Sequence, residues 1–289
     1  MSVLVIGGNG QLGRHLRAEL PQAQFWDRSI VDLSDPVTLA RQLETVRPTA
    51  IVNAAAYTAV DKAESEADLA WRVNAEAPAV LARAAEYADA VMVHVSTDYV
   101  FDGSKAEGYL ETDATRPLNQ YGRSKLAAEL AVASLCSRNW ILRTSWVFSE
   151  HGQNFPKTML RLARDRSELR IVDDQHGRPT YAGDLARCIK GLLDVAGDKA
   201  APPWGLCHVG GGPIVSWRDF AEAIFDRAIA LGLISKAPRI TGIPTADYPT
   251  PARRPLCSVL LTQPAHAHWY SKPFEWQAGL DAVLCALKG

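Results

Sequence analysis

The stretch Val3-Leu4-Val5-Ile6-Gly7-Gly8-Asn9-Gly10-Gln11-Leu12-Gly13 decides the fold of this 289-residue chain. A short apolar run leads directly into closely spaced glycines, and an amphipathic segment at 11–20 follows them. Glycine lets the backbone turn tightly and approach a pyrophosphate, while the helix start offers unpaired N–H groups and a positive dipole end. A strand–helix junction is the context that such a motif needs. The stretch therefore predicts a dinucleotide-binding turn made by Gly7, Gly10, Gln11, Leu12 and Gly13.

The alternation of short apolar runs with amphipathic segments continues to about residue 145. We expect strands at 24–26, 50–53, 90–95 and 140–143, and helices from Pro36 and at 74–87 and 119–137. The largely apolar run at 90–95 is typical of a strand that is covered on both faces. Repeated units of this kind predict an α/β fold, a Rossmann-type doubly wound parallel sheet with right-handed crossovers.

The pattern changes after this point, because prolines cluster at 202–203 and between 244 and 255. Helices are expected near 153–165, 184–196, 216–231 and 275–288, with few strands between them. We therefore divide the chain into a dinucleotide-binding domain, 1–145 plus roughly 180–200, and a smaller C-terminal substrate-binding lobe, 146–180 and 201–289. Ligands of open α/β sheets bind at the carboxyl ends of the strands, where this lobe is expected.

Composition excludes several classes of protein. The formal net charge is −1, so the chain lacks the basic surface typical of nucleic-acid binders. The first apolar run is too short for a signal peptide, and no later run reaches the length of a membrane span. The five cysteines are scattered and form no CxxC pair, which favours free thiols in a reducing cytoplasm over a disulfide framework or zinc site. The histidines likewise show no metal-ligand spacing, so no metal site is predicted.

Several residues at predicted strand ends are candidates for holding the cofactor. Asp27 follows the second strand, where a carboxylate can accept hydrogen bonds from the adenosine ribose, while Arg28 could pair with a 2′-phosphate. This pair leaves NADH and NADPH open. Asp32 and Leu33 could hold the adenine amino group and ring. The third strand ends in small residues against which a cofactor can lie, in the stretch Ala54, Ala55, Ala56, Tyr57 and Thr58.

Ser96-Thr97-Asp98-Tyr99 follows the fourth strand with hydroxyl groups and a carboxylate. Thr97 could hydrogen-bond a substrate carbonyl or hydroxyl, although the same residue types also cap ordinary turns. A third motif favours the catalytic interpretation. Tyr121-Gly122-Arg123-Ser124-Lys125 places Tyr121 and Lys125 on one helical face at i and i+4.

Hydride addition to a ketone produces an alkoxide that needs a proton, and a tyrosine can supply it. A free tyrosine is a weak acid, but a nearby ammonium stabilises the phenolate and is expected to lower its pKa. Lys125 could also hold the nicotinamide ribose. Together with the glycine turn and Thr97, the pair predicts a nicotinamide-dependent reductase with Tyr121 as its proton donor.

These motifs together resemble the extended short-chain dehydrogenase/reductase superfamily and, more closely, the dTDP-4-dehydrorhamnose reductase family. The resemblance runs over nearly the whole chain, through GGNGQLG, NAAAYTAVDKAE, STDYVFDG, PLNQYGRSK, RTSWVF, NFPKTMLRLA and PTPARRP. It implies reduction of the C4 ketone of dTDP-6-deoxy-L-lyxo-4-hexulose to dTDP-L-rhamnose with NADPH or NADH. Thr97, Tyr121 and Lys125 match the family's catalytic positions, and Asp98 and Trp146 match positions near the sugar.

Other candidate ligands of this dTDP-4-keto-6-deoxy sugar come from the second half of the chain. Arg253 and Arg254 could grip its diphosphate, because guanidinium groups match phosphate geometry. Gln175 and Arg178 are weaker candidates. Two departures from the family are Tyr57, where relatives often carry His, and Arg14-His15, where metal-dependent dimeric relatives carry a glutamate. A homodimer therefore stays open without a predicted magnesium bridge.

Two alternatives remain at this point. One is a nucleotide-sugar epimerase or dehydratase of the same superfamily; a dehydratase needs additional acid–base carboxylates, and Asp98 is followed by Tyr99 rather than Glu. The other is a non-catalytic NAD(P)-binding regulatory subunit, which intact Thr97, Tyr121 and Lys125 disfavour.

Overall fold

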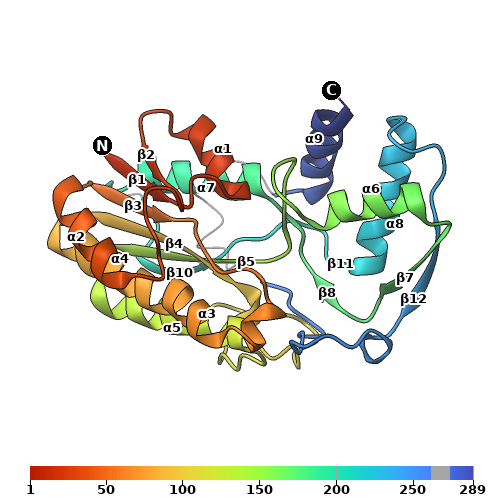
Figure 1. Cartoon of the computed structure of the whole chain (residues 1–289), viewed down its shortest axis with the longest axis horizontal. Coiled ribbons are helices and arrows are strands. Elements are labelled where there is room, and N and C mark those ends of the chain that lie inside the picture. The colour runs from red at the N-terminus through yellow and green to blue at the C-terminus, as the bar shows by residue number, and fades with distance from the viewer. Residues whose placement is uncertain (199–200, 262–273, 289) are drawn as a thin grey trace.

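A computed structural model describes residues 1–198, 201–261 and 274–288. The chain forms two lobes that lie side by side, one around a central sheet and one built mainly from helices (Figure 1). The strands of the central sheet are β1 (Val3–Ile6), β2 (Gln24–Trp26), β3 (Ala50–Asn53), β4 (Val91–Thr97), β5 (Asn139–Thr144) and β10 (Gly205–His208). Among the described residues this sheet has six strands, all parallel, in the order β10-β5-β4-β3-β1-β2. The predicted Rossmann-type doubly wound sheet is confirmed.

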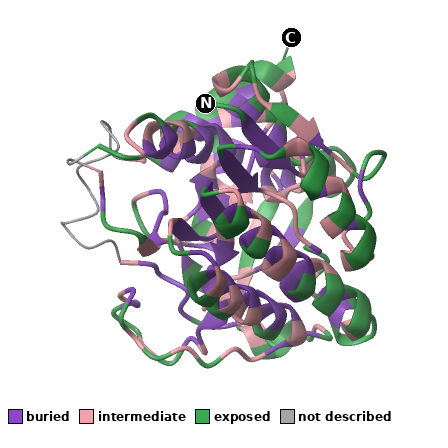
Figure 2. Ribbon diagram, turned by 90° about the vertical axis from the view of Figure 1, so that its left-hand side faces the viewer, coloured by how far each residue is buried: buried purple, intermediate pink, exposed green. Residues whose placement is uncertain are grey.

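Helices cover both faces of this sheet. The helices of the chain are α1 (Gln11–Glu19), α2 (Pro36–Val46), α3 (Ala67–Trp71), α4 (Ala77–Tyr87), α5 (Gln120–Leu135), α6 (Phe155–Asp165), α7 (Ala182–Asp194), α8 (Trp217–Ala230) and α9 (Trp276–Lys288). One face packs on α1 and α7, through Leu16 and Ile189 against Val5, and the other face packs on α2, α4 and α5. Figure 2 shows the resulting buried layer of strands between helices with exposed outer sides.

Alternating strand residues supply the two cores. In β1, Val3 and Val5 point to one core, and Leu4 and Ile6 point to the other. Complete burial of one such leucine contributes roughly 2–3 kcal/mol to folding. Because successive side chains in a strand point to opposite faces, an apolar residue at every position is what a doubly covered strand requires.

The second lobe packs α6, α8 and α9 around a core that includes Phe220, Phe225 and Leu280. Its short strands are β6 (Val147–Phe148), β7 (Glu168–Val172), β8 (His176–Gly177), β9 (Thr180–Tyr181), β11 (Val215–Ser216) and β12 (Arg239–Ile243). The pairs β7–β12 and β6–β9 are parallel, whereas β8–β11 is antiparallel. Single-turn helical segments are η1 (Lys62–Glu64), η2 (Arg72–Glu76), η3 (Asp98–Val100) and η4 (Thr245–Asp247).

Two local expectations differ from the structure. Residues 205–208 were assigned to the second lobe, but β10 pairs with β5 and extends the central sheet. The helix expected at 74–87 is the second part of a continuous helical segment that begins at Ala67 and contains a π turn at Arg72–Glu76 between α3 and α4. Pro78 has no N–H for the carbonyl of Asn74, which interrupts the regular ladder. Asn74 uses its side chain instead to brace the backbone of Tyr57. The helix near 184–196, expected to return to the first lobe, does pack there as α7.

No helix within the described ranges is long and apolar enough to cross a membrane.

Candidate active site

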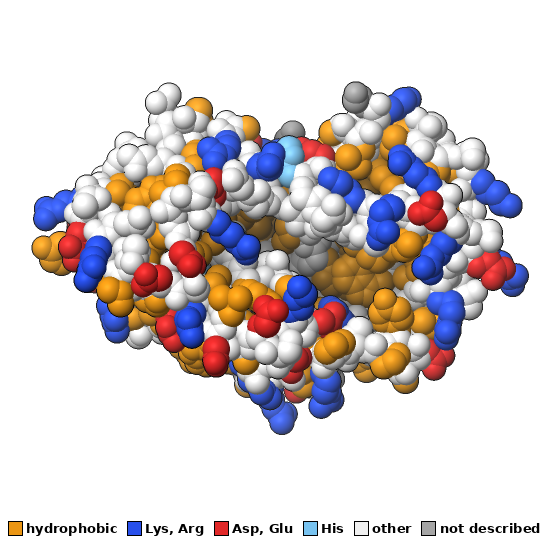
Figure 3. Space-filling model, viewed as in Figure 1, with side chains coloured by type: hydrophobic (Ala, Val, Ile, Leu, Met, Phe, Trp, Pro, Cys, Tyr) orange, Lys and Arg blue, Asp and Glu red, His pale blue; other side chains and the backbone are white. Residues whose placement is uncertain are grey.

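The predicted site residues follow strands that all end at one edge of the sheet. Since β1, β3 and β4 are parallel neighbours, Gly7, Ala54 and Thr97 emerge at the same edge. Figure 3 shows a hollow between the two lobes, with hydrophobic side chains gathered on one wall. The carboxyl-terminal edge of a doubly wound sheet is where ligands bind.

The glycine turn packs so closely on neighbouring backbone that a side chain at Gly7 or Gly13 would collide with it. Gly7 has φ +91°, and a Cβ there would lie 2.8 Å from the amide nitrogen of Ala55. A Cβ on Gly13 would lie 2.1 Å from the Gly7 carbonyl oxygen. Helix α1 then begins at Gln11 behind Gly10, which contributes no side-chain cap. The first-turn N–H groups of α1 are therefore available to an anionic ligand, as the motif predicts.

Asp27 and Arg28 follow β2 at the same edge. The Asp27 carboxylate accepts hydrogen bonds from Ser29 N (2.9 Å), Ser29 Oγ (2.5 Å) and Asn9 Nδ2 (2.5 Å). The hydrogen bonds from Ser29 are the main reason that its pKa is lowered. Arg28 is exposed. Sequence analysis overlooked Arg17, whose Nε donates to the Gly8 carbonyl and whose guanidinium lies 4.4 Å from the Phe25 ring centre.

The other cofactor candidates have different surroundings. Asp32 is exposed, and its Oδ1 accepts hydrogen bonds from the amide and hydroxyl of Ser34. Leu33 packs at the edge of the core beneath α2.

After β3, Ala54 and Ala55 pack on opposite cores, Ala56 is half-buried and Thr58 is exposed. Tyr57 is buried beside Tyr121, and its hydroxyl donates to Glu66 Oε2 at 2.6 Å. The Tyr57 side chain is thus held by the protein, and the small residues before it form the wall facing the glycine turn.

Tyr121 and Thr97 meet where α5 packs on the end of β4. The Thr97 hydroxyl is close enough to Tyr121 to lower the pKa of the Tyr121 hydroxyl. Thr97 Oγ1 also donates to Asp98 Oδ1 at 3.0 Å. Helix α5 approaches closely because residue 122 is glycine; a Cβ there would lie 2.2 Å from the Tyr99 carbonyl oxygen. Asn119 caps α5 by accepting from the Gly122 amide at 2.8 Å. Two separate motifs are therefore joined into one polar centre.

The electrostatics of this centre differ from one sequence expectation. Burial raises the pKa of Tyr121 well above its ordinary value, and the nearby Thr97 hydroxyl lowers it by less. The expected lowering of this pKa by Lys125 is not found, because the Lys125 ammonium is bonded to the Val95 carbonyl instead. Burial also raises the pKa of Asp98 to about 6. Within the described structure, Asp98 Oδ2 is a buried oxygen without a hydrogen-bond partner.

Lys125 is almost fully buried, at 1% exposure. Its Nζ donates to the Val95 carbonyl at 2.6 Å and lies 3.2 Å from His94 Nε2. Burial lowers the pKa of Lys125 to about 8, against an opposing influence of Glu129. The lysine therefore remains mainly an ammonium at neutral pH, close to the pH at which it loses its proton.

Sequence analysis did not anticipate the contact with His94. Asn53 Oδ1 accepts from the Ala55 amide at 3.2 Å, so Asn53 Nδ2 faces His94 Nδ1 at 3.1 Å. With this amide orientation, His94 Nδ1 is the acceptor, and the proton of the neutral ring lies on Nε2, opposite Lys125. Burial lowers the pKa of His94 well below its ordinary value. An N–H facing Nζ favours the neutral amine of Lys125.

Behind this centre lies a buried ion pair between α5 and β5. Arg143 NH2 donates to Glu129 Oε2 at 2.7 Å, and Ser96 Oγ donates to Glu129 Oε1 at 2.5 Å. The two charged side chains are only 4% and 5% exposed. Glu129 lies one helical turn beyond Lys125, so the pair connects α5 to the ends of β4 and β5 near the turn of α5 that carries Tyr121 and Lys125.

The second lobe contributes an aromatic wall. Trp146 stacks on Trp217 with ring centres 3.5 Å apart and planes 7° from parallel. Gln175 accepts from Trp217 Nε1 at 3.1 Å and donates to Thr245 Oγ1 at 3.1 Å. Arg178 donates to the carbonyls of Gly211 and Leu260, both at 2.7 Å. Gln175 and Arg178 thus hold the second lobe together through these bonds.

The Pro-rich segment around 251–255 lies against the first lobe. Arg254 donates to Tyr99 Oη at 2.9 Å and to Asp61 Oδ2 at 2.7 Å. The carbonyl of Arg253 accepts from Asn119 Nδ2 at 2.8 Å, and its side chain is exposed. Since Asn119 begins α5, both arginines lie beside the turn that carries Tyr121. The contacts of Arg254 with Tyr99 and Asp61 were not predictable from local sequence.

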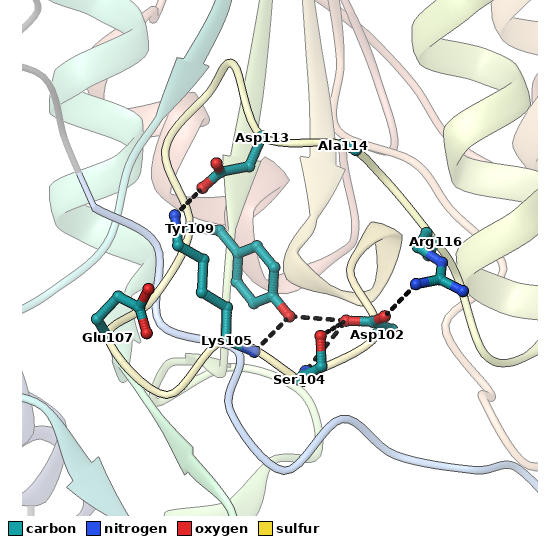
Figure 4. Close-up of a pocket in the computed structure, with 8 residues that line it drawn as sticks. All are labelled: Asp102, Ser104, Lys105, Glu107, Tyr109, Asp113, Ala114 and Arg116. Carbon is teal, nitrogen blue, oxygen red and sulfur yellow. Dashed lines mark hydrogen bonds and ion pairs between the residues drawn. The ribbon is translucent and has the colours of Figure 1, made fainter.

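A separate shallow pocket lies in the loop at 102–116, between β4 and α5 (Figure 4). Its polar groups bind one another: Tyr109 Oη donates to Asp102 Oδ1 at 2.8 Å, and Lys105 Nζ donates to Asp113 Oδ2 at 2.7 Å. These bonds give the loop its shape, and they account for the polar side chains drawn there.

Comparison with known proteins was made for the whole chain. The family model for the RmlD substrate binding domain matches residues 1–288. A curated dTDP-4-dehydrorhamnose reductase of Shigella flexneri is 42% identical, over 98% of this chain and 97% of the relative. The chain belongs to the dTDP-4-dehydrorhamnose reductase family. The resemblance stated from the motifs is confirmed.

Solved structures of family members share the fold throughout. A dTDP-4-dehydrorhamnose reductase from Clostridium acetobutylicum superposes with a TM-score of 0.91 at 35% identity, covering 100% of both chains. One from Bacillus anthracis, solved in complex with NADP, gives a TM-score of 0.89 at 34% identity over 99% of both chains. Family members therefore share both lobes, and the role of each individual site residue in this chain remains a prediction.

Proposed function

We propose that this protein is an NAD(P)H-dependent dTDP-4-dehydrorhamnose reductase, an oxidoreductase that reduces the C4 ketone of dTDP-6-deoxy-L-lyxo-4-hexulose to give dTDP-L-rhamnose. The observation that carries the proposal is the convergence of buried Thr97 and Tyr121 where α5 packs on the end of β4, with buried Lys125 one helical turn beyond Tyr121. The similarity to reductases of this name over nearly the full chain supports the choice of sugar.

The glycine turn fits a dinucleotide. Gly7 and Gly13 allow a tight turn that packs on neighbouring backbone, and the uncapped start of α1 behind this turn suits a pyrophosphate held by backbone N–H groups. When bound, the reduced nicotinamide supplies the hydride. Asp27 would accept from the ribose, Asp32 and Leu33 would hold the adenine, and Ala54, Ala55, Ala56, Tyr57 and Thr58 would form the wall beside the cofactor. NADPH is favoured if Arg17 and Arg28 meet a 2′-phosphate, whereas Asp27 favours NADH.

Tyr121 and Thr97 would both bind the C4 carbonyl oxygen and polarise it. Because burial keeps the pKa of Tyr121 high, its hydroxyl is protonated at neutral pH and can give its proton to the forming alkoxide. The buried Asp98 Oδ2, which lacks a partner, would accept from a sugar hydroxyl. Lys125 would hold the phenolate that remains and would orient the cofactor ribose.

The second lobe would close over the sugar and its nucleotide. Trp146, fixed by stacking on Trp217, offers an apolar face to the deoxysugar. Exposed Arg253 is the better placed of the two arginines for the diphosphate, because Arg254 is already bonded to Asp61 and Tyr99. Gln175 and Arg178 would act mainly by positioning Trp217 and neighbouring loops.

The two alternatives are less well supported. A dehydratase needs further acid–base carboxylates, and the residue after Asp98 is Tyr99, whose hydroxyl accepts from Arg254. A regulatory subunit would not require Thr97, Tyr121 and Lys125 to converge on a single buried centre.

We further propose that the enzyme works in the cytoplasm, because all five cysteines are free thiols and four of them are buried. The chain could also form a homodimer. Such a dimer would lack a magnesium bridge through the glutamate of metal-dependent relatives, because this chain carries Arg14-His15 at that turn. Sedimentation of the purified protein would measure its assembly.

Substitution of individual site residues tests the proposed roles. Tyr121→Phe removes only the donor hydroxyl and should lower kcat by about 100-fold or more, with cofactor affinity nearly unchanged. Thr97→Val should lower kcat while thermal stability changes little. The matched control is Tyr87→Phe, at an exposed tyrosine outside the site. Turnover by Tyr121→Phe equal to that of the control would refute Tyr121 as the proton donor.

A further inference from the structure

Three potential metal ligands converge on the surface between α1 and the loop that follows β6. They are His15, Glu150 and His151, and one ligand atom from each lies within 4.8 Å of the other two. His15 Nε2 is 3.3 Å from Glu150 Oε2, and His151 Nε2 is 3.7 Å from Glu150 Oε1. The two imidazole ring centres are 5.2 Å apart. Nothing in the proposed reductase mechanism uses these side chains.

The separations between the ligand atoms suit a common ion. Zinc binds imidazole nitrogen and carboxylate oxygen at about 2.0–2.2 Å, so ligand atoms of a tetrahedral site lie roughly 3.4 Å apart. The two contacts between imidazole and carboxylate, at 3.3 and 3.7 Å, are close to that spacing. His15 Nε2 also lies 3.0 Å from Ser149 Oγ, which an ion would displace. Two imidazoles and one carboxylate leave further coordination positions for water.

The surrounding side chains hold the ligands in place. Tyr181 packs its ring edge-on against His15, with centres 5.1 Å apart, and its hydroxyl donates to Glu150 Oε2 at 3.4 Å. Asn154 donates to the carbonyl of Ser149 at 2.5 Å and to Gln11 Oε1 at 2.8 Å. The loop that carries Glu150 and His151 is therefore tied to the first residue of α1, in the glycine turn. Outer contacts of this kind preorganise a metal site.

We propose that His15, Glu150 and His151 form a binding site for a divalent transition-metal ion such as Zn²⁺. The ion would connect α1 of the dinucleotide-binding domain to the loop that begins the second lobe. Its role would be structural, because it would hold the glycine turn against the residues at 149–154. This site was not predicted from the sequence, because His15 is more than a hundred positions away from Glu150 and His151.

The test uses untagged protein that has been stripped with a chelator and then titrated with Zn²⁺ by calorimetry and with Co²⁺ by visible absorption. We expect one ion per chain, a Co²⁺ ligand-field spectrum of mixed nitrogen and oxygen coordination, and a rise in Tm with Zn²⁺. His15→Ala, Glu150→Gln and His151→Ala should each weaken binding by at least about 10-fold. His176→Ala and Cys285→Ser remove an exposed imidazole and an exposed thiol outside the cluster and should leave binding unchanged.

Each variant is checked for its far-UV spectrum and for cofactor binding, so that loss of metal is not confused with loss of fold. Absence of saturable binding in the wild-type protein would overturn the proposal. So would equal binding by wild type and by a His15→Ala/His151→Ala variant that remains folded, or loss of binding in Cys285→Ser. Reductase activity is not the measured quantity, so failure of this site and failure of the proposed function are distinguishable.

Discussion

Replacement of Lys125 by Met is expected to stabilise the free protein at neutral pH while it removes activity. Burial lowers the pKa of Lys125 from 10.5 to about 8. This difference corresponds to a cost of roughly 3 kcal/mol for holding the ammonium in the folded state below pH 8. Methionine has a similar length and no charge, but it leaves the Val95 carbonyl without its donor, which costs about 1–2 kcal/mol. The net stabilisation at pH 7 is therefore about 1–2 kcal/mol.

The pH dependence makes this prediction specific. Between pH 8 and 10.5 the unfolded chain still binds the lysine proton that the folded protein has lost, so wild-type stability rises with pH by roughly 3 kcal/mol in total. Lys125→Met has no such group. The variant should be more stable than wild type at pH 7, and the difference should reverse by about pH 10.5.

Urea unfolding followed by tryptophan fluorescence, at several values from pH 7 to 10.5, measures this difference. Lys105→Met is the control. Lys105 donates to Asp113, and this bond raises the pKa of Lys105. The stability that the bond contributes is therefore retained until the pH exceeds 10.5. A stability difference between Lys125→Met and wild type that does not vary with pH would refute the reasoning, as would strong destabilisation at pH 7.

Three further predictions concern the framework and the cofactor. Glu129→Gln leaves Arg143 buried without its partner and should lower the unfolding free energy by about 3–5 kcal/mol, measured in urea; a loss below about 1 kcal/mol would contradict a buried pair. Gly122→Ala places a Cβ against the Tyr99 carbonyl, so it should lower the unfolding free energy by about 1–3 kcal/mol in the same measurement and should also lower kcat. Turnover equal to that of wild type would contradict the tight packing of α5. Arg28→Ala should raise KM for NADPH more than KM for NADH in steady-state kinetics; equal effects would exclude a 2′-phosphate contact.

The parts of the fold that sequence predicted are those specified by local patterns. The glycine turn and the alternation of apolar residues depend on neighbours within a few positions, and both appear where expected. Strand β10 was missed because Gly205–His208 is short and follows a Pro-rich segment, and only its pairing with β5 identifies it. The contact of Asn74, in the π turn before α4, with Tyr57 has no local signal because the two residues are seventeen positions apart.

The same distinction applies to the candidate site. The spacing of Tyr121 and Lys125 indicates that they share a face of a helix, but burial and bonding partners come from β4, and these reverse the expected change in the pKa of Tyr121. His94 sits within a largely apolar strand, so its contact with Lys125 has no local signal. Arg254 and Asp61 meet across nearly two hundred residues. Contacts of this kind follow from packing rather than from local sequence.

The most direct test of the central claim is reduction of dTDP-4-keto-6-deoxyhexose, generated with its epimerase, followed by loss of NADH and NADPH absorbance in parallel and by identification of the product. The account predicts cofactor oxidation that depends on the sugar, formation of dTDP-L-rhamnose, and loss of both with Tyr121→Phe. Tight cofactor binding without any sugar-dependent oxidation would contradict it and would favour a regulatory subunit.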